Sequence, residues 1–381
     1  MNKILITGGA GFIGQHLTLK LLSLGYEINI LDNFSKQIHA NNDDLPLAIK
    51  DKVTLFKGDI RDRELLMNAL VGVEKIVHLA AETGTGQSMY DIENYFSVNV
   101  QGTALLLDLL QNDKIGNQIK NIVVASSRAI YGEGAYSCSK DGIVYPDQRL
   151  FEHLENGKFE PICPICASNV EVEPTNENAP FKPMSYYGIT KQVQEQMILM
   201  FAKNKGINGF GLRYQNVYGP GQSLSNPYTG ILAVFSNLAK EGKPIDIYED
   251  GKESRDFVYI DDVVNATVSA LNFQGKYVGP MNVGSGQQTS VLDVAQLINS
   301  YFDKSSTISI SGSFRIGDIR HNKADLTMAK KILNYDPMIF FKQGILNFLN
   351  WAHNQNVQKF KSYEESVLEL QSKGLMGKTN N

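Results

Sequence analysis

Short apolar segments alternate with longer stretches of helical spacing along the first 214 residues. The apolar segments, which are typical of buried strands, lie at 3–7, 26–32, 53–60, 75–81, 121–127 and 209–214. The clearest helical spacing lies between them, at 11–25, 94–111 and 185–204. Strands that alternate with helices predict a doubly wound α/β fold, in which helices cover both faces of a parallel sheet.

The regular pattern breaks at 133–182, a segment that holds all three cysteines. We interpret it as an insert in the first domain, and we expect 35–52 to be a polar surface loop or short helix. The chain is then predicted to divide into a nucleotide-binding domain at 1–217, to which 254–284 returns, a smaller C-terminal substrate-binding domain at 218–356, and a tail at 357–381. Within that tail, 357–377 has the spacing of an amphipathic helix.

Composition narrows the classes of function. Of 381 residues, 43% are hydrophobic and 20% are charged, as in ordinary globular proteins, and the net charge is -4. That charge predicts no general affinity for nucleic acid, but it leaves room for a small anion in a local basic pocket. No apolar run reaches the roughly 20 residues that span a membrane. Three cysteines are too few for a disulfide scaffold, so we expect a reduced, cytoplasmic protein.

The first strand ends in a glycine-rich turn that leads into the first helix. The spacing of Gly8, Gly11 and Gly14 allows a pyrophosphate to approach the backbone and the helix N-terminus closely. Asp32 ends the second strand, where a carboxylate accepts hydrogen bonds from ribose hydroxyls and favours NAD over NADP, a preference that Lys36 weakens. The alternative is a plain tight turn with a surface aspartate. The expected NAD contacts are Gly8, Gly11, Phe12, Ile13, Gly14, Asp32, Asn33, Asp59, Ile60, Leu79, Ala80, Ala81, Asn99, Tyr187 and Lys191.

Tyr187 and Lys191 are four residues apart on an expected helix and therefore share a face. A phenol titrates near pH 10, so it acts as a base at neutral pH only when a positive charge favours the phenolate. Ser127, at the end of the fifth strand, is placed to hold a substrate hydroxyl near that base. The alternative is that an amphipathic helix produced this spacing by chance.

Ten segments resemble the extended short-chain dehydrogenases/reductases, in the nucleotide-sugar epimerase/dehydratase family. They are TGGAGFIG, LDNFS, GDIRD, HLAAE, SSRAIYG, SYYGITK, LRYQNVYGPGQ, RDFVYIDDVV, NVGSG and FRIGDIRH. The resemblance implies a Rossmann-type fold, catalytic Ser127, Tyr187 and Lys191, and a homodimer formed through the helices at 94–111 and 185–204. It also implies contacts from Asn216, Arg255 and Arg315 to a nucleotide diphosphate. The alternative for Arg255 is a surface ion pair with Asp256.

Arg128 and Ala129 narrow the chemistry that this resemblance implies. Dehydratases of the family carry an Asp-Glu acid/base pair at these two positions, and neither Arg128 nor Ala129 can eliminate water. Other branches use a glutamate, or a cysteine and a histidine, that SSRAIYG lacks. Hydride transfer without elimination remains, most commonly 4-epimerisation by an isomerase.

HLAAETGTGQSMY (78–90) and GPGQSLSNPYTGILAVFS (219–236), with the cysteine insert, are most similar to the branch that interconverts dTDP-L-rhamnose and dTDP-6-deoxy-L-talose. A net NAD(P)-dependent oxidoreductase on a similar nucleotide sugar, a UDP-hexose 4-epimerase and a non-catalytic NAD-binding protein stay as alternatives. The expected substrate contacts are Glu82, Gln87, Ser88, Ser127, Arg128, Asn216, Gln222, Asn226, Tyr228, Arg255 and Arg315.

The cysteine spacing in the insert suggests a structural zinc site. Cys163 and Cys166 form a Cys-x-x-Cys pair, and Cys138 lies upstream. Zinc prefers four ligands, so Asp141 or His153 would supply the fourth. The alternative is a degenerate site that is held by packing alone.

Overall fold

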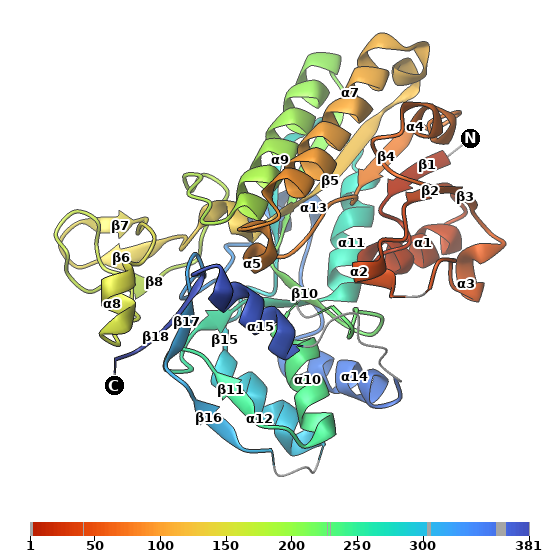
Figure 1. Cartoon of the computed structure of the whole chain (residues 1–381). Coiled ribbons are helices and arrows are strands. Elements are labelled where there is room, and N and C mark those ends of the chain that lie inside the picture. Colours follow the sequence, from red (N-terminus) through yellow and green to blue (C-terminus); the bar gives the residue numbers. More distant parts are fainter. Residues whose placement is uncertain are drawn as a thin grey trace.

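Seven parallel strands form the central sheet among the residues that the structure describes (Figure 1). The structure is a computed structural model that describes residues 3–40, 42–226, 228, 230–302, 306–355 and 363–380. In spatial order the strands are β14 (Val278–Val283), β9 (Asn208–Tyr214), β5 (Asn121–Ser127), β4 (Lys75–His78), β1 (Lys3–Thr7), β2 (Glu27–Asp32) and β3 (Thr54–Lys57). The expected doubly wound α/β fold is confirmed, and β14 pairs with β9 in the same sheet.

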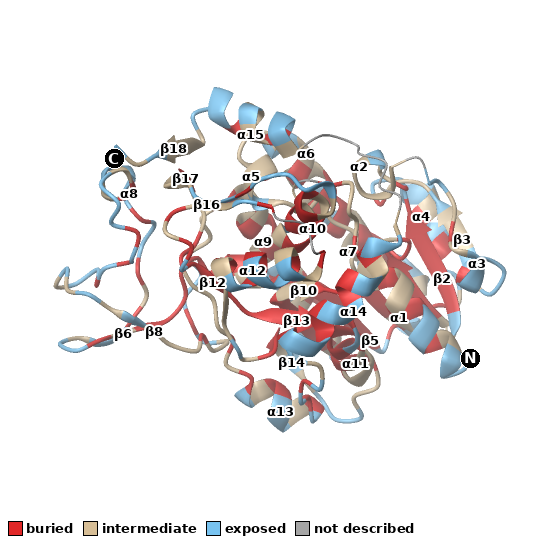
Figure 2. Cartoon of the chain, turned by 90° about the horizontal axis from the view of Figure 1, so that it is seen from below, coloured by how far each residue is buried: buried red, intermediate tan, exposed pale blue. Residues whose placement is uncertain are grey.

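Side chains that alternate along each strand build a hydrophobic core on each face of the sheet. On β1, Ile4 and Ile6 belong to one core and Leu5 to the other. The first core packs against α1 (Phe12–Ser23) and α11 (Ile260–Leu271). The second core packs against α4 (Arg63–Ala69), α7 (Gly102–Asn112) and α9 (Tyr186–Lys205). Both cores lie along the buried strands that cross the middle of Figure 2.

The first core continues into a smaller C-terminal lobe. Three pairs of short strands shape this lobe: β10 (Asn216–Tyr218) with β13 (Phe257–Tyr259), β11 (Ile245–Ile247) with β16 (Ile308–Ile310), and β12 (Ser254–Arg255) with β15 (Thr289–Ser290). The helices that pack with them are α10 (Ile231–Glu241), α12 (Val291–Tyr301) and α14 (Phe341–His353), whereas α13 (Thr327–Leu333) packs against β14 and α11.

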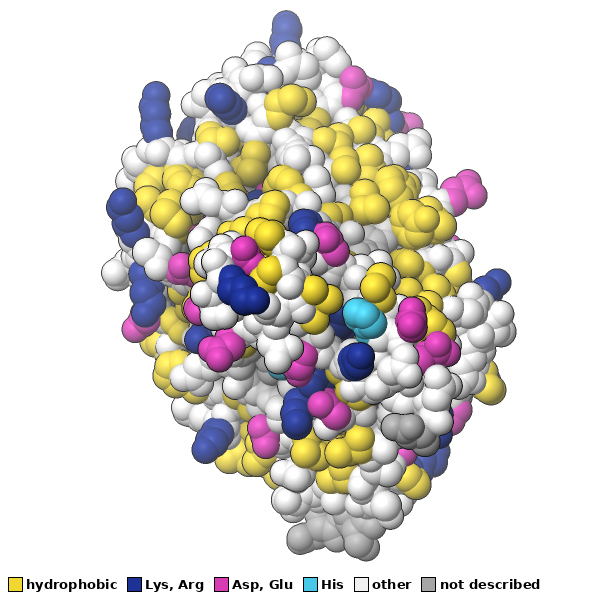
Figure 3. All heavy atoms as spheres, turned by 90° about the vertical axis from the view of Figure 1, so that its left-hand side faces the viewer, with side chains coloured by type: hydrophobic (Ala, Val, Ile, Leu, Met, Phe, Trp, Pro, Cys, Tyr) yellow, Lys and Arg dark blue, Asp and Glu magenta, His cyan; other side chains and the backbone are white. Residues whose placement is uncertain are grey.

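The cysteine-containing segment projects from the body of the molecule as a small lobe (Figure 1). Its three-stranded sheet has the order β7 (Gly142–Val144), β6 (Tyr136–Cys138) and β8 (Glu171–Val172), and α8 (Phe151–Glu155) lies beside it. Figure 3 views the molecule from this side, where charged side chains of both signs are interspersed.

The C-terminal segment crosses in front of the C-terminal lobe and then joins it (Figure 1). Residues 357–362 of the predicted helix lie outside the described residues. The helix α15 spans Tyr363–Ser372, and Gly374 then adopts a φ of +69°. This turn leads into β18 (Met376–Lys378), which pairs with β17 (Ser313–Arg315). The prediction of one helix through 377 is therefore wrong at its end, because a left-handed glycine ends the helix.

Four further helices of one turn each lie in the described nucleotide-binding part, which also holds the π-helix η1 (Phe96–Gln101) and the 3₁₀ helices η2 (Lys114–Gln118) and η3 (Arg128–Tyr131). The polar segment 35–52 folds as α2 (Lys36–His39) and α3 (Leu47–Lys50), and the segment after β4 holds α5 (Thr85–Ser88) and α6 (Ile92–Tyr95). Among the described residues, no helix has the length and apolar character needed to cross a membrane.

Candidate active site

A cleft of about 530 Å³ lies at the carboxyl ends of the central strands, between the sheet and the C-terminal lobe. The glycine-rich turn lines one part of it, and the ends of β4 and β5 line the middle. Side chains of the C-terminal lobe line the rest. Carboxyl ends of parallel strands are where ligands bind in doubly wound folds. The length of this lining suits an elongated ligand or two ligands end to end.

The glycines of the glycine-rich turn let backbone segments pack so closely that a side chain would clash. Gly8 has a φ of +70°, and a Cβ there would lie 2.8 Å from the backbone nitrogen of Ala80. A Cβ at Gly14 would lie 2.6 Å from the Cα of Gly9. The helix α1 starts directly after Gly11 and has no acidic residue in its first turn. Free N–H groups and a positive helix end therefore face the cleft, and they fit the pyrophosphate of a dinucleotide.

Asp32 lines the cleft at the end of β2. Its two carboxylate oxygens accept hydrogen bonds from the backbone N–H groups of Ala10 and Phe34, both at 2.9 Å. These bonds hold the carboxylate beside the glycine-rich turn. His39 lies 3.6 Å from Asp32, and burial lowers the pKa of this imidazole although Asp32 opposes the shift. His39 also lines the cleft and was not predicted from the sequence.

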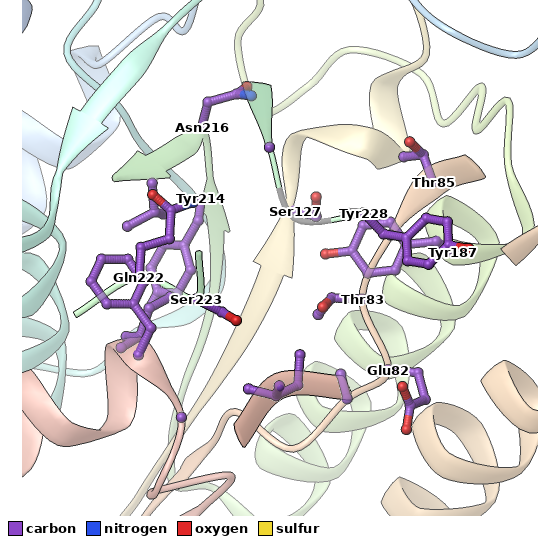
Figure 4. Close-up of a pocket in the computed structure, with 18 of the residues that line it drawn as sticks. Glu82, Thr83, Thr85, Ser127, Tyr187, Tyr214, Asn216, Gln222, Ser223 and Tyr228 are labelled. Atoms are coloured by element: carbon purple, nitrogen blue, oxygen red, sulfur yellow. The ribbon is translucent and has the colours of Figure 1, made fainter. Parts of the chain in front are cut away.

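Ser127, Tyr187 and Lys191 meet in the middle of the cleft, as their order along the chain predicts. Ser127 ends β5, and Figure 4 shows it beside the ring of Tyr187. Tyr187 and Lys191 lie in the first turns of α9, whose N-terminus is capped by Ser185, which accepts a 3.1 Å hydrogen bond from the Gly188 amide.

Burial shifts the pKa values of both residues on α9. It raises the pKa of Tyr187, while a hydrogen bond with Ser127 and the charge of Arg128 act in the opposite direction. Burial also lowers the pKa of Lys191 to about 7, although the Glu195 carboxylate opposes this change. The two pKa values therefore move in opposite directions, so the ammonium loses its proton at a lower pH than the phenol does.

A buried polar network behind Lys191 was not predicted from the sequence. The Lys191 ammonium donates to the Gln194 side-chain oxygen at 2.8 Å, and the Gln194 amide donates to Thr103 at 3.0 Å. His78 lies 2.9 Å from the same Thr103 hydroxyl, and burial followed by the charge of Lys191 lowers the pKa of His78 to about 3. The signal available in the sequence was the polar residue Gln194 on the buried face of a helix.

Three arginines line the part of the cleft toward the C-terminal lobe: Arg128, Arg255 and Arg315. Arg255 forms an ion pair with Asp318 at 3.1 Å, and not with Asp256. Burial opposes ionisation of Asp318, but Arg255 and then Arg315 hold the pKa of this carboxyl below its usual range. Burial, and then the nearby charge of Arg255, lowers the pKa of Arg128 to about 10. Asp246 and Glu253 also line the cleft, but burial raises the pKa of Glu253 to about 7, which reduces its negative charge near neutral pH. The three arginines therefore leave a positive excess that favours an anion.

Most of the residues predicted from sequence line the cleft. Besides those described above, the lining includes Phe12, Ile13, Asn33, Ile60, Leu79, Ala81, Glu82, Asn216, Gln222 and Tyr228. Five predicted residues are not among the lining residues: Asp59, Gln87, Ser88, Asn99 and Asn226.

Local hydrogen bonds account for the positions of these five residues. Asp59 pairs with Arg61 at 2.7 Å, and Gln87 exchanges hydrogen bonds with Gln37. The Ser88 hydroxyl donates to the Thr85 carbonyl, and Asn226 accepts from the Tyr228 amide. Asn99 is fully buried, and its side chain bonds to both the N–H and the carbonyl of Glu82. It thus positions a lining residue from behind.

The helix α15 contributes to the cleft from the C-terminal segment, a contact that was not predicted from the sequence. Tyr363 lines the cleft and lies 2.8 Å from the hydroxyl of Tyr248. Glu369 accepts hydrogen bonds from Tyr90 at 2.8 Å and from Tyr228 at 2.9 Å. Tyr228 lies near Tyr187 in Figure 4, so α15 is joined to a wall of the reactive region.

The chain belongs to the NAD dependent epimerase/dehydratase family, whose model matches residues 4–149 and 164–284. It is 40% identical to the dTDP-L-rhamnose 4-epimerase of Burkholderia thailandensis over 357 residues, which cover 92% of this chain and 94% of that protein.

The structure is also similar to two solved structures of nucleotide-sugar 4-epimerases. The UDP-glucose 4-epimerase of Thermotoga maritima with UDP-glucose has 28% identity and a TM-score of 0.72, with 92% of this chain and 98% of that chain covered. The UDP-glucuronic acid 4-epimerase of Bacillus cereus in complex with UDP-glucuronic acid and NAD has 26% identity, a TM-score of 0.72 and the same coverage.

Proposed function

We propose that this protein is an NAD-dependent nucleotide-sugar 4-epimerase that interconverts dTDP-L-rhamnose and dTDP-6-deoxy-L-talose. The observation that carries the proposal is the position of Ser127, Tyr187 and Lys191 between the glycine-rich turn and the three arginines, in one cleft. The cleft therefore has a cofactor part, a reactive part and an anion part in that order.

The cofactor part fits NAD. The backbone at Gly8, Gly11 and Gly14 would hold the pyrophosphate, and Asp32 would accept hydrogen bonds from ribose hydroxyls. NAD held by these residues would supply a reversible hydride acceptor for C4 of the sugar. Asp32 disfavours a 2′-phosphate because two negative charges would be brought together.

Tyr187 acts as the base in this proposal. Its phenolate oxygen removes the proton from the sugar 4-hydroxyl as C4 is oxidised, and the phenol returns the proton to the 4-keto oxygen after the sugar has turned over. Ser127 holds that oxygen in reach of Tyr187, and the positive charges of Lys191 and Arg128 stabilise the phenolate. Because the proton is returned, the residues are restored at the end of each cycle.

The residues after Ser127 argue against elimination of water. Arg128 is a cation and Ala129 has no titratable group, so neither can exchange protons with C5 and C6 of a sugar at neutral pH. Arg128 instead lies near Arg255 and Asp318, where it would bind phosphate oxygens of the substrate.

The relative from Burkholderia thailandensis supports the choice of dTDP-L-rhamnose among nucleotide sugars. The solved relatives named above act as 4-epimerases on UDP-sugars, so a UDP-hexose is the competing substrate. The test is proton NMR of dTDP-L-rhamnose incubated with the purified protein and no added cofactor. A new set of sugar signals inverted at C4 is expected, and it would indicate retained NAD at the same time.

UDP-hexoses, and then assays with added NAD or NADH, form the other arms of this experiment. If the protein converted a UDP-hexose but not dTDP-L-rhamnose, the proposed substrate would be wrong and the proposed 4-epimerisation would stand. Turnover only with stoichiometric NAD or NADH would contradict the epimerase and favour a net oxidoreductase.

We also infer a homodimer formed through α7 and α9, which run side by side on the outer surface of the sheet (Figure 1). Met200 of α9 is 63% exposed, which suits a helical interface. Light scattering would give twice the mass of one chain, and a Met200→Glu variant would reduce it.

A further inference from the structure

Two turns in the projecting lobe have the same backbone design and face each other. The first joins β6 to β7 and runs from Cys138 to Asp141. The second runs from Cys163 to Cys166, and it is closed by an antiparallel bridge between Ile162 and Asn169. Each turn therefore has a potential metal ligand at its first and fourth positions.

Backbone N–H groups point at the first sulfur in both turns. Those of Lys140 and Asp141 bond to Cys138, and those of Ile165 and Cys166 bond to Cys163. These matching bonds fix the first sulfur of each turn in the same position relative to its backbone, close to the other potential ligand atoms.

The residue after each turn adopts a left-handed conformation. Gly142 follows Asp141 with a φ of +72°, and Ala167 follows Cys166 with a φ of +56°. Such a φ is easy for glycine but unfavourable for alanine. The turn at 163–166 thus keeps the shape of the other one although its sequence does not favour it.

The four potential ligand atoms form a small cluster in which every pair lies within 4.8 Å. The sulfurs of Cys138 and Cys166 are 3.6 Å apart, and Asp141 Oδ2 lies 3.4 Å from Cys138 Sγ and 3.2 Å from Cys163 Sγ. A tetrahedral zinc, with bonds of about 2.3 Å to sulfur and about 2.0 Å to oxygen, separates its ligands by roughly 3.5–3.8 Å. We propose that Cys138, Asp141, Cys163 and Cys166 bind one Zn²⁺ ion.

The chemistry of the ligands selects the metal and the role. Three thiolates favour zinc over magnesium or calcium, and four protein ligands leave no open position for a substrate. His153 lies on α8 and is not part of the cluster, so Asp141 is the fourth ligand. The hydrophobic cluster around the cysteines has four buried residues among those described: Tyr136, Cys138, Val144 and Cys163. So small a core needs a further bond to hold it, and the zinc is structural.

Charged residues at the base of the lobe connect it to residues of the cleft. Glu133 precedes β6 and accepts a hydrogen bond from the Arg320 amide at 2.8 Å. Arg149 follows β7, pairs with Glu133 at 3.2 Å, and donates to the carbonyl of Asp318 at 3.0 Å. Asp318 is the partner of Arg255 in the cleft. The zinc therefore holds a lobe that supports the anion part, although the ion is outside the cleft. The zinc proposal does not depend on the proposed epimerase activity.

The test is metal analysis of the full-length protein, purified with reductant and without chelator, by inductively coupled plasma mass spectrometry. One zinc per chain is expected in the wild type and in Ser139→Ala, which changes an exposed residue of the same turn. Cys163→Ser should lose the metal. Replacement by Co²⁺ should give the visible absorption of a tetrahedral thiolate site, and Asp141→Cys should change that spectrum toward four sulfurs.

Three outcomes would overturn the proposal. The first is a wild-type protein without metal and with three titratable thiols. The second is a disulfide between Cys138 and Cys166, seen as one titratable thiol and a mass two daltons lower. The third is zinc that Cys163→Ser retains, since the metal would then lie elsewhere. If Cys163→Ser does not fold, three other measurements still test the zinc proposal. They are the wild-type zinc content, the thiol count, and the Co²⁺ spectra of wild type and Asp141→Cys.

Discussion

The ammonium of Lys191 lies 2.8 Å from the side-chain oxygen of Gln194, and both side chains are buried. This oxygen is neutral, and the amide of the same side chain is bound to Thr103. The nearby carboxylate of Glu195 is itself paired with Arg213 at 2.6 Å. The positive charge thus has no carboxylate of its own, which explains why burial lowers the pKa of Lys191 to about 7.

Replacing Lys191 by methionine should abolish turnover and yet stabilise the fold below neutral pH. An unfolded lysine titrates near pH 10.4. Between about pH 7 and pH 10 the unfolded chain therefore holds a proton that the folded chain has lost, and the stability that Lys191 contributes rises with pH. The free energy of unfolding of Lys191→Met should exceed that of the wild type by a few kcal/mol below pH 7, since one pKa unit is about 1.4 kcal/mol. This difference should shrink toward pH 10.

Urea unfolding of wild type and Lys191→Met at pH 6 and pH 9.5, at matched NAD content, measures this difference. Comparing the two proteins at each pH cancels the other titrating groups. A stability difference that does not vary with pH would contradict the lowered pKa of Lys191.

Tyr187→Phe should lower kcat about 10²- to 10⁴-fold, the usual contribution of a general base, and leave NAD bound. The ring is kept, so packing in the cleft is preserved while the reactive oxygen is lost. Turnover is followed by NMR, and NAD is measured in the supernatant of the denatured protein. Tyr186→Phe is the matched control, because Tyr186 is the preceding residue and is not among those that line the cleft. Near wild-type turnover in Tyr187→Phe would remove this residue as the base.

Local sequence patterns predicted the parts of the site that depend on one segment or on the order of strands. The glycine-rich turn is a property of the residues between β1 and α1, and it lines the cleft where expected. Ser127 and Tyr187 follow from the rule that the carboxyl ends of parallel strands meet at one edge. The alternation of apolar segments predicted the sheet itself.

Contacts between distant segments were not predictable in the same way. Asp318 pairs with Arg255, 63 residues away, because the C-terminal lobe folds back on itself. Glu369 reaches Tyr90 across 279 residues. No periodic pattern in a single sequence indicates that two such distant positions are in contact. Judged from its neighbours in the sequence, each of these residues resembles an ordinary polar surface residue. The predicted terminal helix was wrong at its end for a local reason, because Gly374 ends it, but the pairing of β18 with β17 depends on the folded chain.

Arg255→Met should raise KM for the nucleotide sugar roughly 10- to 100-fold, since a hydrogen bond to a charged group contributes about 1.5–3 kcal/mol. NAD content should not change, because Arg255 lies in the anion part of the cleft. Lys252→Ala is the control, as this neighbouring cation is exposed.

The loss of Arg255 also leaves Asp318 without its ion-pair partner. Arg255→Met combined with Asp318→Asn should therefore recover fold stability but not KM. Recovery of KM in the double variant would show that Arg255 acts only by neutralising Asp318.

The contact of α15 with the cleft leads to the last prediction. Glu369 accepts hydrogen bonds from Tyr90 and Tyr228, and only Tyr228 of these two lines the cleft. Glu369→Ala should raise KM roughly tenfold, because each lost hydrogen bond of this kind contributes about 1 kcal/mol or more and two are lost. The effect on kcat should be small, since Glu369 does not touch the reactive residues.

Steady-state kinetics on Glu369→Ala, Tyr90→Phe and the double variant test whether the effect passes through these hydrogen bonds. The double variant should raise KM by less than the product of the single effects, because both changes remove the same bond. Gln371→Ala changes an exposed residue of α15 and serves as the control. If Glu369→Ala left KM unchanged, the bonds of Glu369 to Tyr90 and Tyr228 would not contribute to substrate binding. Multiplicative effects would instead place the contribution of Glu369 in its bond to Tyr228, which could then be tested alone with Tyr228→Phe.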